Sequence, residues 1–219
     1  MFNFALLKQK ALKTDLTDKQ IQILEVAETL FAEKGFDGTS IRDISKVAKI
    51  NIAMVSYYFG SKEHLLEALI LYKTSGLKEL LVNLIEEDLD PVEKMNKLIE
   101  LYINRINCHK GIYRILHFEL ASKKRMLDLQ SFSEIKKANL KSLELIIQEG
   151  QEKGVFRKDV IIPLLSPTIL GTYFHFYMNK PFFEELLDLK TEEAFNNYIQ
   201  NDLKKHIQQT IKALLIYEN

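Results

Sequence analysis

The 219-residue sequence predicts an all-α protein, in which a small N-terminal helical unit is joined to a larger helical bundle. Apolar residues recur at the three- and four-residue spacing of helices along almost the whole chain. Only 8 glycines and 4 prolines interrupt this pattern, and every proline lies beyond residue 90. No run alternates between apolar and polar residues for long enough to predict a sheet.

Capping residues mark the first helix, which we expect to begin at Thr17. Thr17 and Gln20 fit a capping box, in which the Thr17 hydroxyl accepts from the backbone N–H of Gln20 and the amide side chain reaches back to the helix start. Apolar residues then recur at helical spacing between residues 21 and 31. Gly35 suits the left-handed C-cap that would end this helix.

Two short helices and the start of a fourth helix follow. Thr39-Ser40 is expected to open the second helix, whose apolar residues share one face: Ile41, Ile44, Val47 and Ala48. Only Ile50 and Asn51 separate it from a third, very short helix at residues 52–59, for which Asn51 is a good N-cap. Gly60-Ser61 ends that helix and caps a fourth, which begins at Lys62.

The helices lengthen beyond residue 85. Asp90, Pro91 and Glu93 occupy the N-cap and the first turn of a helix that ends near Gly111. Further helices are predicted at residues 112–121, 126–149, 166–180 and 191–217. Ser166-Pro167 is expected to open the third of these four, and Thr191 to cap the last.

The two short helices predict a helix-turn-helix motif. A helix of about eight residues is not stable alone and must be held by its neighbours. In a helix-turn-helix the second helix is short because it enters the major groove of DNA end-on, while the first packs across it. Four apolar residues are expected to form the core that fixes the pair: Ile44, Val47, Val55 and Phe59.

Charge in this segment favours a nucleic-acid partner, although the whole chain carries 30 basic and 30 acidic residues. What matters for DNA binding is where the basic groups cluster. Residues 39–62 contain Arg42, Lys46, Lys49 and Lys62 against a single acid, Asp43. The first 13 residues add Lys8, Lys10 and Lys13 without an acid, whereas residues 63–219 carry 21 basic and 23 acidic side chains.

The motifs at residues 35–63 resemble a known family. The segment GFDGTSIRDIS at residues 35–45 is followed by Val47-Ala48 and then by SYYFGSKE at residues 56–63. With the helix lengths and the turn position, these residues look like the DNA-binding domain of the tetracycline-repressor (TetR) family of bacterial regulators, over about residues 17–70. The segment GVFRKD at residues 154–159 is also similar to family members and is weaker support.

The resemblance implies a homodimer whose two recognition helices read the half-sites of a near-palindromic operator. It divides the chain into an N-terminal extension (1–16), a helix-turn-helix DNA-binding domain (17–62) and a C-terminal ligand-binding and dimerisation domain (63–219). The expected protein is a sequence-specific transcriptional regulator in the cytoplasm. Its partners would be double-stranded operator DNA and an unidentified small-molecule effector that releases the repressor.

The resemblance also implies which residues meet DNA: Ser40, Arg42, Ala53, Met54, Ser56, Tyr57, Tyr58 and Lys62. Their chemistry assigns roles independently. Lys62 lies at a helix N-terminus, where backbone N–H groups suit a phosphate. The hydroxyls of Ser56, Tyr57 and Tyr58 can donate to phosphates. Arg42 has the fork geometry for guanine or phosphate.

Two positions depart from the family pattern. Many members have Gly where Lys49 stands, so Lys49 must tolerate the conformation of the turn or the turn must differ. Many have Tyr where Ser56 stands, which changes the expected phosphate contact. No residue between Ile52 and Val55 can form a bidentate hydrogen bond with a base. We therefore expect readout by thymine methyl contacts, by Arg42 and by DNA shape.

The larger helical part suggests a ligand pocket and a dimer seam. Tyr113, His117 and Tyr177 are candidates for the pocket, because each carries a polar tip on an apolar body. By resemblance, the 126–149 and 166–180 helices would form a four-helix dimer interface. The candidate apolar seam comprises Leu140, Leu143, Ile147, Ile169, Tyr173 and Phe176. For the pocket residues, ordinary core packing is the competing interpretation.

Other interpretations of the basic segments remain open. Tyr57 and Tyr58 could be an aromatic pair packed between helices. Lys46 and Lys49 could belong to a solvated face, and the lysines of the first 13 residues to a frayed terminus rather than a DNA-binding arm. A helical adaptor that binds proteins, without sequence-specific DNA binding, is the alternative function.

Several functional classes find no support in the sequence. It contains no phosphate-binding glycine loop, no dinucleotide-binding motif, no nucleophile elbow and no Glu-x-x-His pair, so we expect neither an enzyme nor a cofactor or metal. No apolar run is long enough to cross a membrane. Cys108 is the only cysteine, which excludes an intrachain disulfide, and we expect it to fill a small space in the core.

Overall fold

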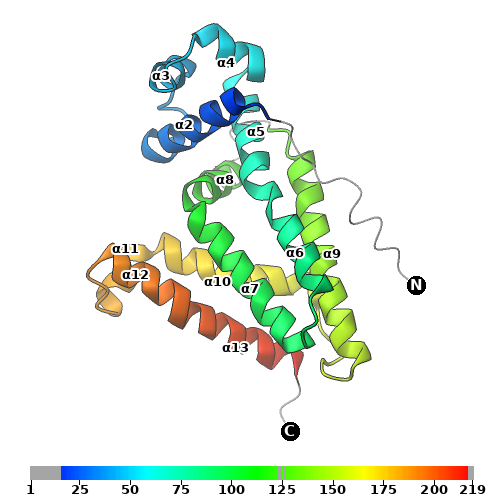
Figure 1. Cartoon of the computed structure of the whole chain (residues 1–219). Coiled ribbons are helices and arrows are strands. Elements are labelled where there is room, and N and C mark those ends of the chain that lie inside the picture. Colours follow the sequence, from blue (N-terminus) through cyan, green and yellow to red (C-terminus); the bar gives the residue numbers. More distant parts are fainter. Residues whose placement is uncertain (1–15, 123–124, 126, 217–219) are drawn as a thin grey trace. The chain divides into compact units, whose positions relative to one another are not determined.

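The computed structural model describes residues 16–122, 125 and 127–216, and the predicted all-α architecture is confirmed over these residues (Figure 1). The helices are α2 (Asp18–Lys34), α3 (Ile41–Val47), α4 (Ile52–Phe59), α5 (Lys62–Ser75), α6 (Leu77–Glu86), α7 (Pro91–Cys108), α8 (Lys110–Ser122), α9 (Gln130–Glu152), α10 (Ile162–Met178), α11 (Lys180–Leu186), α12 (Glu192–Tyr198), the π-helical segment η1 (Ile199–Leu203) and α13 (Lys204–Leu215). The predicted basic extension with Lys8, Lys10 and Lys13 lies outside the described residues.

The chain divides into two compact units. Unit 1 comprises Met1–Lys78 and Cys108–Lys137, and unit 2 comprises Glu79–Asn107 and Ala138–Asn219. Each unit therefore combines segments that are far apart in the sequence. The functional boundary predicted between residues 62 and 63 does not follow from this division into units, and it stays a prediction.

Unit 1 is built around α2, which packs against α3, α5 and α8. Its core consists of apolar side chains that the helical spacing of each segment turns inward, among them Ile23, Leu24, Phe31, Ile44, Val55, Leu66 and Ile112. At roughly 25 cal/mol per Å² of apolar surface removed from water, burial of this kind holds helices that are too short to persist alone. The short helices α3 and α4 are thus held in place by α2 and α5.

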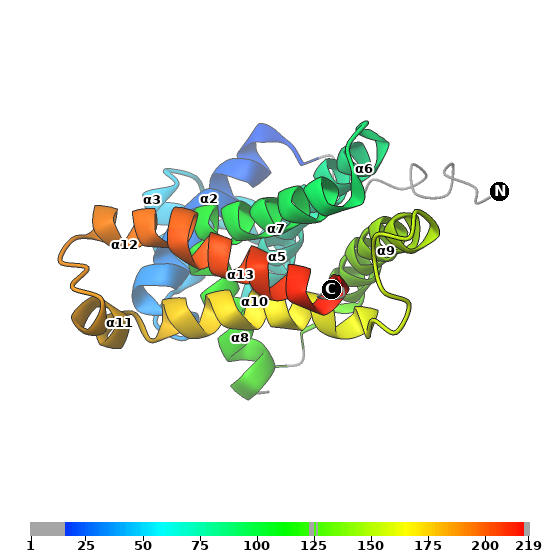
Figure 2. The same ribbon diagram turned by 90° about the horizontal axis from the view of Figure 1, so that it is seen from below.

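Unit 2 contains most of α7, the C-terminal part of α9, and the helices from α10 to α13. Figure 2 shows α10 and α13 running side by side, and their contact is one of the main ones in this unit. Lys94 on α7 is almost fully buried, and its ammonium group lies 2.8 Å from Glu149 Oε2 on α9. The same group donates a hydrogen bond to the carbonyl of Ile85, so it ties α7 to both α9 and the end of α6.

Most predicted helix starts are confirmed by their caps. The hydroxyl of Thr17 accepts from the backbone of Gln20, and both halves of the capping box are present. Asp90 Oδ1 accepts from the backbone N–H groups of Val92 and Glu93, and Thr191 accepts from the backbone of Ala194. These contacts join residues two or three positions apart, which is why sequence alone predicts them.

The C-terminal helices differ from the prediction in three ways. Helix α10 begins at Ile162 rather than Ser166, because Pro163 takes a first-turn position, and Pro167 lies inside the helix. An additional short helix, α11, follows it. The predicted 191–217 helix is interrupted by the π-helical η1 and ends at Leu215, where Ile216 turns extended.

Two residues expected in the core are exposed. Val47 is 54% exposed, because Ile44 and Ala48 occupy the centre of the buried stripe of α3 and the last residue of this short helix falls outside it. Cys108, at the end of α7, is also exposed. The prediction of a core cysteine is therefore wrong.

Candidate nucleic-acid interface

Helix α3 begins at a complete capping box. Ser40 Oγ accepts from the backbone N–H of Asp43 at 3.1 Å and donates to Asp43 Oδ2 at 2.6 Å, while the Ser40 N–H donates to the same carboxylate. The hydrogen bonds from Ser40 hold the pKa of Asp43 below its usual value. The hydroxyl of Ser40, a predicted DNA contact, therefore forms hydrogen bonds that fix the start of α3.

The turn between α3 and α4 places Lys49 in the left-handed region, with φ at 53°. The Ile50 N–H donates to the carbonyl of Ser45, and Gln22 Nε2 on α2 donates to the carbonyl of Ala48. The turn is therefore held by a backbone hydrogen bond of its own and by a side-chain hydrogen bond from α2. The expectation that Lys49 must tolerate an unusual backbone conformation is confirmed. A glycine would adopt the same conformation without a steric penalty.

Helix α4 matches the predicted recognition helix in both its bounds and its cap. Asn51 Oδ1 accepts from the backbone N–H of Ala53 at 2.9 Å. Val55 and Phe59 face the core of unit 1, so the opposite side of α4 is turned away from that core. On this side Ala53 and Ser56 are exposed and Met54 is half-buried.

The two tyrosines of α4 differ in their surroundings. Tyr57 is 84% exposed, whereas Tyr58 is half-buried and packs against the core cluster of unit 1. Their rings meet edge to face with centroids 5.4 Å apart. The alternative of a pair packed between helices therefore fits Tyr58 but not Tyr57, whose phenolic group projects into solvent.

Exposed cations lie on α3 and in the turn that leads into α4. Arg42 lies in the first turn of α3, Lys46 in its last turn and Lys49 in the turn, and all three are exposed. Among the described residues, none of the three forms an ion pair. An apolar and hydroxyl-bearing helix flanked by exposed cations is the arrangement expected of a recognition helix in a major groove.

Lys62 is placed differently from the other cations. Its Nζ donates hydrogen bonds to the carbonyls of Phe36 at 2.9 Å and Thr39 at 2.8 Å, and it lies 4.2 Å from the centroid of the Phe36 ring. The side chain therefore joins the start of α5 to the turn between α2 and α3. A phosphate contact by Lys62 stays a prediction, and the structure adds a positioning role.

Sequence reasoning missed two residues at this turn, Arg125 and Glu119. The guanidinium of Arg125 contacts Asp37 and pairs with both carboxylate oxygens of the buried Glu119. Asp37 and Arg125 are 88 positions apart in the sequence, so no local pattern links them.

The predicted ligand residues are divided between the two units. Tyr113 and His117 lie on α8 in unit 1, and Tyr177 lies on α10 in unit 2, where its ring stacks on that of Tyr173. Partial desolvation and the nearby charge of Lys136 lower the pKa of His117 below its usual value. Their joint role in a pocket stays a prediction.

Five of the six predicted dimer residues are covered within a single chain. Leu143, Ile147, Ile169 and Tyr173 show no exposed surface and Phe176 is 4% exposed, whereas Leu140 is half-buried. Tyr173 also donates a hydrogen bond to Asn107 Oδ1 at 3.0 Å. These five side chains belong to the core of unit 2, because they lie on the stripes of α9 and α10 that face the inside of the bundle. They offer almost no surface to a second chain.

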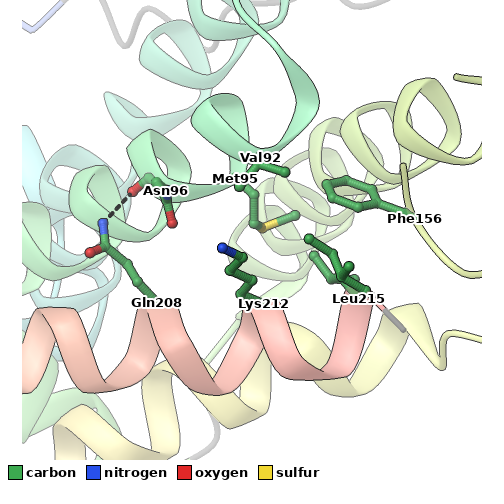
Figure 3. A pocket seen from close by; sticks show the side chains of 8 residues that line it. Val92, Met95, Asn96, Phe156, Gln208, Lys212 and Leu215 are labelled. Carbon is green, nitrogen blue, oxygen red and sulfur yellow. Dashed lines mark hydrogen bonds between the residues drawn. The ribbon is translucent and has the colours of Figure 1, made fainter. Parts of the chain in front are cut away.

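A hollow in unit 2 lies where α7 faces α13 (Figure 3). Side chains from α7 and α13 line it together with Phe156, and Gln208 Nε2 donates to the carbonyl of Asn96 across it. Its cavity volume is about 10 Å³, and only the surrounding space open to solvent brings the figure to about 190 Å³. Pockets for drug-sized molecules usually measure about 300–1,000 Å³, so this hollow is small for an effector.

A membrane span and a metal centre are both absent from the described residues. None of the helices there is both long and apolar enough to cross a bilayer. In the same part of the chain, no three His, Cys, Asp or Glu side chains are grouped so that they could hold a metal ion.

The α3–turn–α4 geometry and its exposed cations define a helix-turn-helix DNA-binding protein. Residues 23–69 match the family described as bacterial regulatory proteins, tetR family, and residues 91–211 match the family described as tetracyclin repressor-like, C-terminal domain. The second match alone covers more than half of the chain. The chain therefore belongs to the tetR family and is a DNA-binding transcriptional regulator.

Individual relatives agree with this family. The chain is 25% identical over 191 residues to the probable HTH-type transcriptional regulator YttP of Bacillus subtilis, covering 80% of this chain and 89% of that protein. It is 29% identical over 149 residues to the HTH-type transcriptional repressor NicS of Pseudomonas putida, covering 64% and 66%. A transcriptional regulator from Saccharomonospora viridis, solved in complex with choline, has the same fold, with a TM-score of 0.72, 19% identity and coverage of 93% and 100%.

Proposed function

We propose that this protein is a ligand-released repressor that binds a near-palindromic operator as a homodimer. The observation that carries the proposal is the side of α4 that faces away from the core, together with the exposed cations Arg42 and Lys46 on α3 and Lys49 in the turn before α4. A relative named as a repressor and a structural neighbour solved with a small molecule are consistent with it.

In this proposal α4 enters the major groove and the cations meet the phosphates. Ala53 and Met54 contact base edges and thymine methyl groups, because neither carries a hydrogen-bonding side chain. Ser56, Tyr57 and Tyr58 donate to phosphates, with Tyr57 the most accessible of the three. Arg42 can form a bidentate hydrogen bond with guanine through its guanidinium fork. Ser40 and Lys62 contribute by fixing the start of α3 and the turn before it.

The homodimer requires a surface other than the five buried seam residues. The outer stripe of α10 offers one, since Leu164 is 57% exposed, Met178 is 56% exposed, and the exposed Gly171 lies between them on the same face. Nothing lies within 4 Å of the position that a Cβ at Gly171 would take, so another helix could approach closely there. We propose that this stripe, with Leu140 as a peripheral contact, meets a second chain.

Effector release is constrained by thermodynamics. A ligand frees the operator only if it binds the conformation that does not bind DNA more tightly, and DNA must weaken ligand binding by the same factor. Tyr113, His117 and Tyr177 remain the proposed contacts. Because the hollow at α7 and α13 is small, we do not assign the effector to it.

Selection of binding sites from random DNA with the purified full-length protein tests the proposal. We expect an enriched two-fold symmetric site, bound about 10³-fold or more tightly than unrelated DNA at the same salt concentration. Half-sites one turn apart, at about 34–36 Å, are expected for a dimer of this motif. Enrichment of no site would contradict specific binding and would favour the helical adaptor.

A further inference from the structure

Phe36, in the turn between α2 and α3, is held by two cations from other parts of unit 1. Lys62 Nζ and the guanidinium carbon of Arg125 each lie 4.2 Å from the centroid of the Phe36 ring. Lys62 also donates to the carbonyls of Phe36 and Thr39. The Thr39 hydroxyl donates to the carbonyls of Leu30 and Gly35, which fixes the end of the turn directly before the cap of α3.

Arg125 connects this turn to helix α8. Its Nη1 lies 2.6 Å from each carboxylate oxygen of Glu119 on α8, and its Nη2 donates to Asp37 in the turn. The side chain of Glu119 is 3% exposed, whereas that of Asp37 is 69% exposed. The Asp37 hydrogen bond, followed by the interactions with Glu119, raises the pKa of Arg125. One guanidinium thus satisfies a buried acid and holds an exposed one.

Helix α8 is itself anchored beside the same turn. Arg114 Nη2 donates to the carbonyl of Ala32 near the end of α2, and a Cβ at Gly111 would lie 3.3 Å from the Ala32 side chain. Farther along the chain, the backbone N–H of Asp128 donates to Glu67 Oε1 on α5. The segment around α8 therefore contacts α2 and α5, which support the helix-turn-helix.

We propose that Arg125 is a positioning residue for DNA binding, which holds the Phe36–Thr39 turn through Asp37 and thereby fixes the start of α3. Arg125 lies within residues 91–211, the segment that matches the C-terminal domain, and outside residues 23–69. A shift of this arginine away from Asp37 would release the turn. The contact therefore gives the C-terminal segment a route to the DNA-binding helices, and it rests on the function proposed above.

The substitution Asp37→Asn tests the contact with little effect on the core, because Asp37 is exposed and the buried pair between Arg125 and Glu119 remains. Removal of a negative charge near a DNA-binding surface by itself strengthens DNA binding. The positioning role predicts the opposite sign, with binding to the selected operator weakened about fivefold or more. Glu33→Gln is the matched control, since Glu33 is an exposed acid near the end of α2. It should leave operator affinity unchanged or slightly higher.

A second comparison separates positioning from stability. Arg125→Met alone leaves the carboxylate of Glu119 buried without its partner, which destabilises the fold. The double variant Arg125→Met with Glu119→Gln removes that buried charge, so its thermal midpoint should recover most of the loss. Its operator affinity should stay about as weak as that of Asp37→Asn. Affinity that recovers together with the thermal midpoint would show that Arg125 acts only through stability and would overturn the proposal.

The outcomes distinguish this inference from the proposed function. If the parent protein selects no operator, the proposed function fails. If the parent selects an operator and Asp37→Asn binds it as tightly as Glu33→Gln does, the repressor proposal stands and the positioning role of Arg125 is refuted. Fluorescence anisotropy with the selected operator, at one fixed salt concentration, measures all the affinities.

Discussion

At the scale of single residues, the turn of the helix-turn-helix carries backbone strain at one position, Lys49. Lys49 has a φ of 53°, a conformation that costs a residue with a Cβ roughly 1–2 kcal/mol. It is also one of the exposed cations beside α4. Backbone strain at this position thus accompanies a charge that suits a phosphate.

Lys49→Gly should stabilise the fold and weaken DNA binding. Relief of the left-handed strain, less the greater entropy of glycine in the unfolded chain, should raise the free energy of unfolding by about 0.5–1 kcal/mol. Lys46→Gly is the control, because Lys46 lies within α3. Glycine there should lower the free energy of unfolding by about 1 kcal/mol. Urea denaturation measures the free energy of unfolding of both variants. A lower value for Lys49→Gly than for the parent protein would contradict the strain argument.

Lys62 and Lys46 should respond differently to neutralisation. Lys62→Met removes two hydrogen bonds from an ammonium group to backbone carbonyls, so it should lower the free energy of unfolding by about 1–3 kcal/mol. Lys46→Met should leave stability nearly unchanged and reduce the slope of log affinity against log salt by about one. Thermal melts and salt titrations of operator binding check both. An unchanged salt slope in Lys62→Met would remove Lys62 from the phosphate contacts.

His117 should make stability depend on pH. Its pKa in the folded protein is lowered, so the unfolded chain takes up the proton first as the pH falls. The free energy of unfolding should therefore decrease as the pH drops through the ordinary histidine value of about 6.5, and reach a plateau below the folded-state pKa. His117→Gln should remove this part of the dependence, measured by denaturation between pH 8 and 5, at about one-unit steps. Substitution of the exposed His206 on α13 serves as the control.

At the scale of elements, the segment after α9 shows how a short motif positions a core residue. Gly154 adopts a φ of 71°, and the N–H groups of Val155 and Phe156 both donate to the carbonyl of Gly150. The chain thus folds back over the end of α9, and the ring of Phe156 rests on Gly150. The GVFRKD segment, which resembles family members, has this structural role.

Gly150→Ala should destabilise unit 2, although alanine favours helices. An added Cβ would lie 2.0 Å from Phe156 Cδ2, so the buried ring must move. We expect a loss of about 1–3 kcal/mol, as is usual for overpacking. Gly171→Ala is the control at protein concentrations low enough to keep both variants monomeric, because open space surrounds Gly171 within one chain and the change should be neutral or stabilising there. Equal thermal midpoints for the two variants would contradict the close packing.

At the scale of the whole molecule, zero net charge conceals where the charges lie. Arg42, Lys46 and Lys49 are exposed on α3 and in the turn before α4, whereas many other cations, such as Lys94, pair with acids within the fold. A homodimer would carry two such basic surfaces. Overall composition therefore does not exclude a DNA-binding protein, because affinity for phosphates depends on local clustering.

Dimer formation through α10 is expected to be sensitive to charge at Gly171. Gly171→Glu leaves the monomer core untouched and places a carboxylate in the middle of the proposed interface. We expect sedimentation to show a monomer at concentrations where the parent is a dimer, with a loss of operator affinity of about 100-fold or more. Leu80→Glu, at a 42% exposed position on α6, is the control. A dimeric Gly171→Glu would place the interface elsewhere.

The sequence by itself predicted most of the helices and the location of the DNA-binding motif. The caps at Thr17, Ser40 and Asn51 join residues two or three positions apart, and helical spacing assigned most inward faces. Such contacts are local, so their partners can be predicted from neighbouring residues in the sequence.

Only the tertiary structure decided which side chains already have partners within the chain. Arg125 meets Asp37 across 88 positions, Lys62 turns toward the α2–α3 turn, and five of the six predicted dimer residues pack inside one chain. A large apolar residue on a helix looks the same in sequence whether it faces its own core or a partner. The choice depends on which elements the fold brings together, because burial and long-range pairing are properties of packed helices rather than of a single segment.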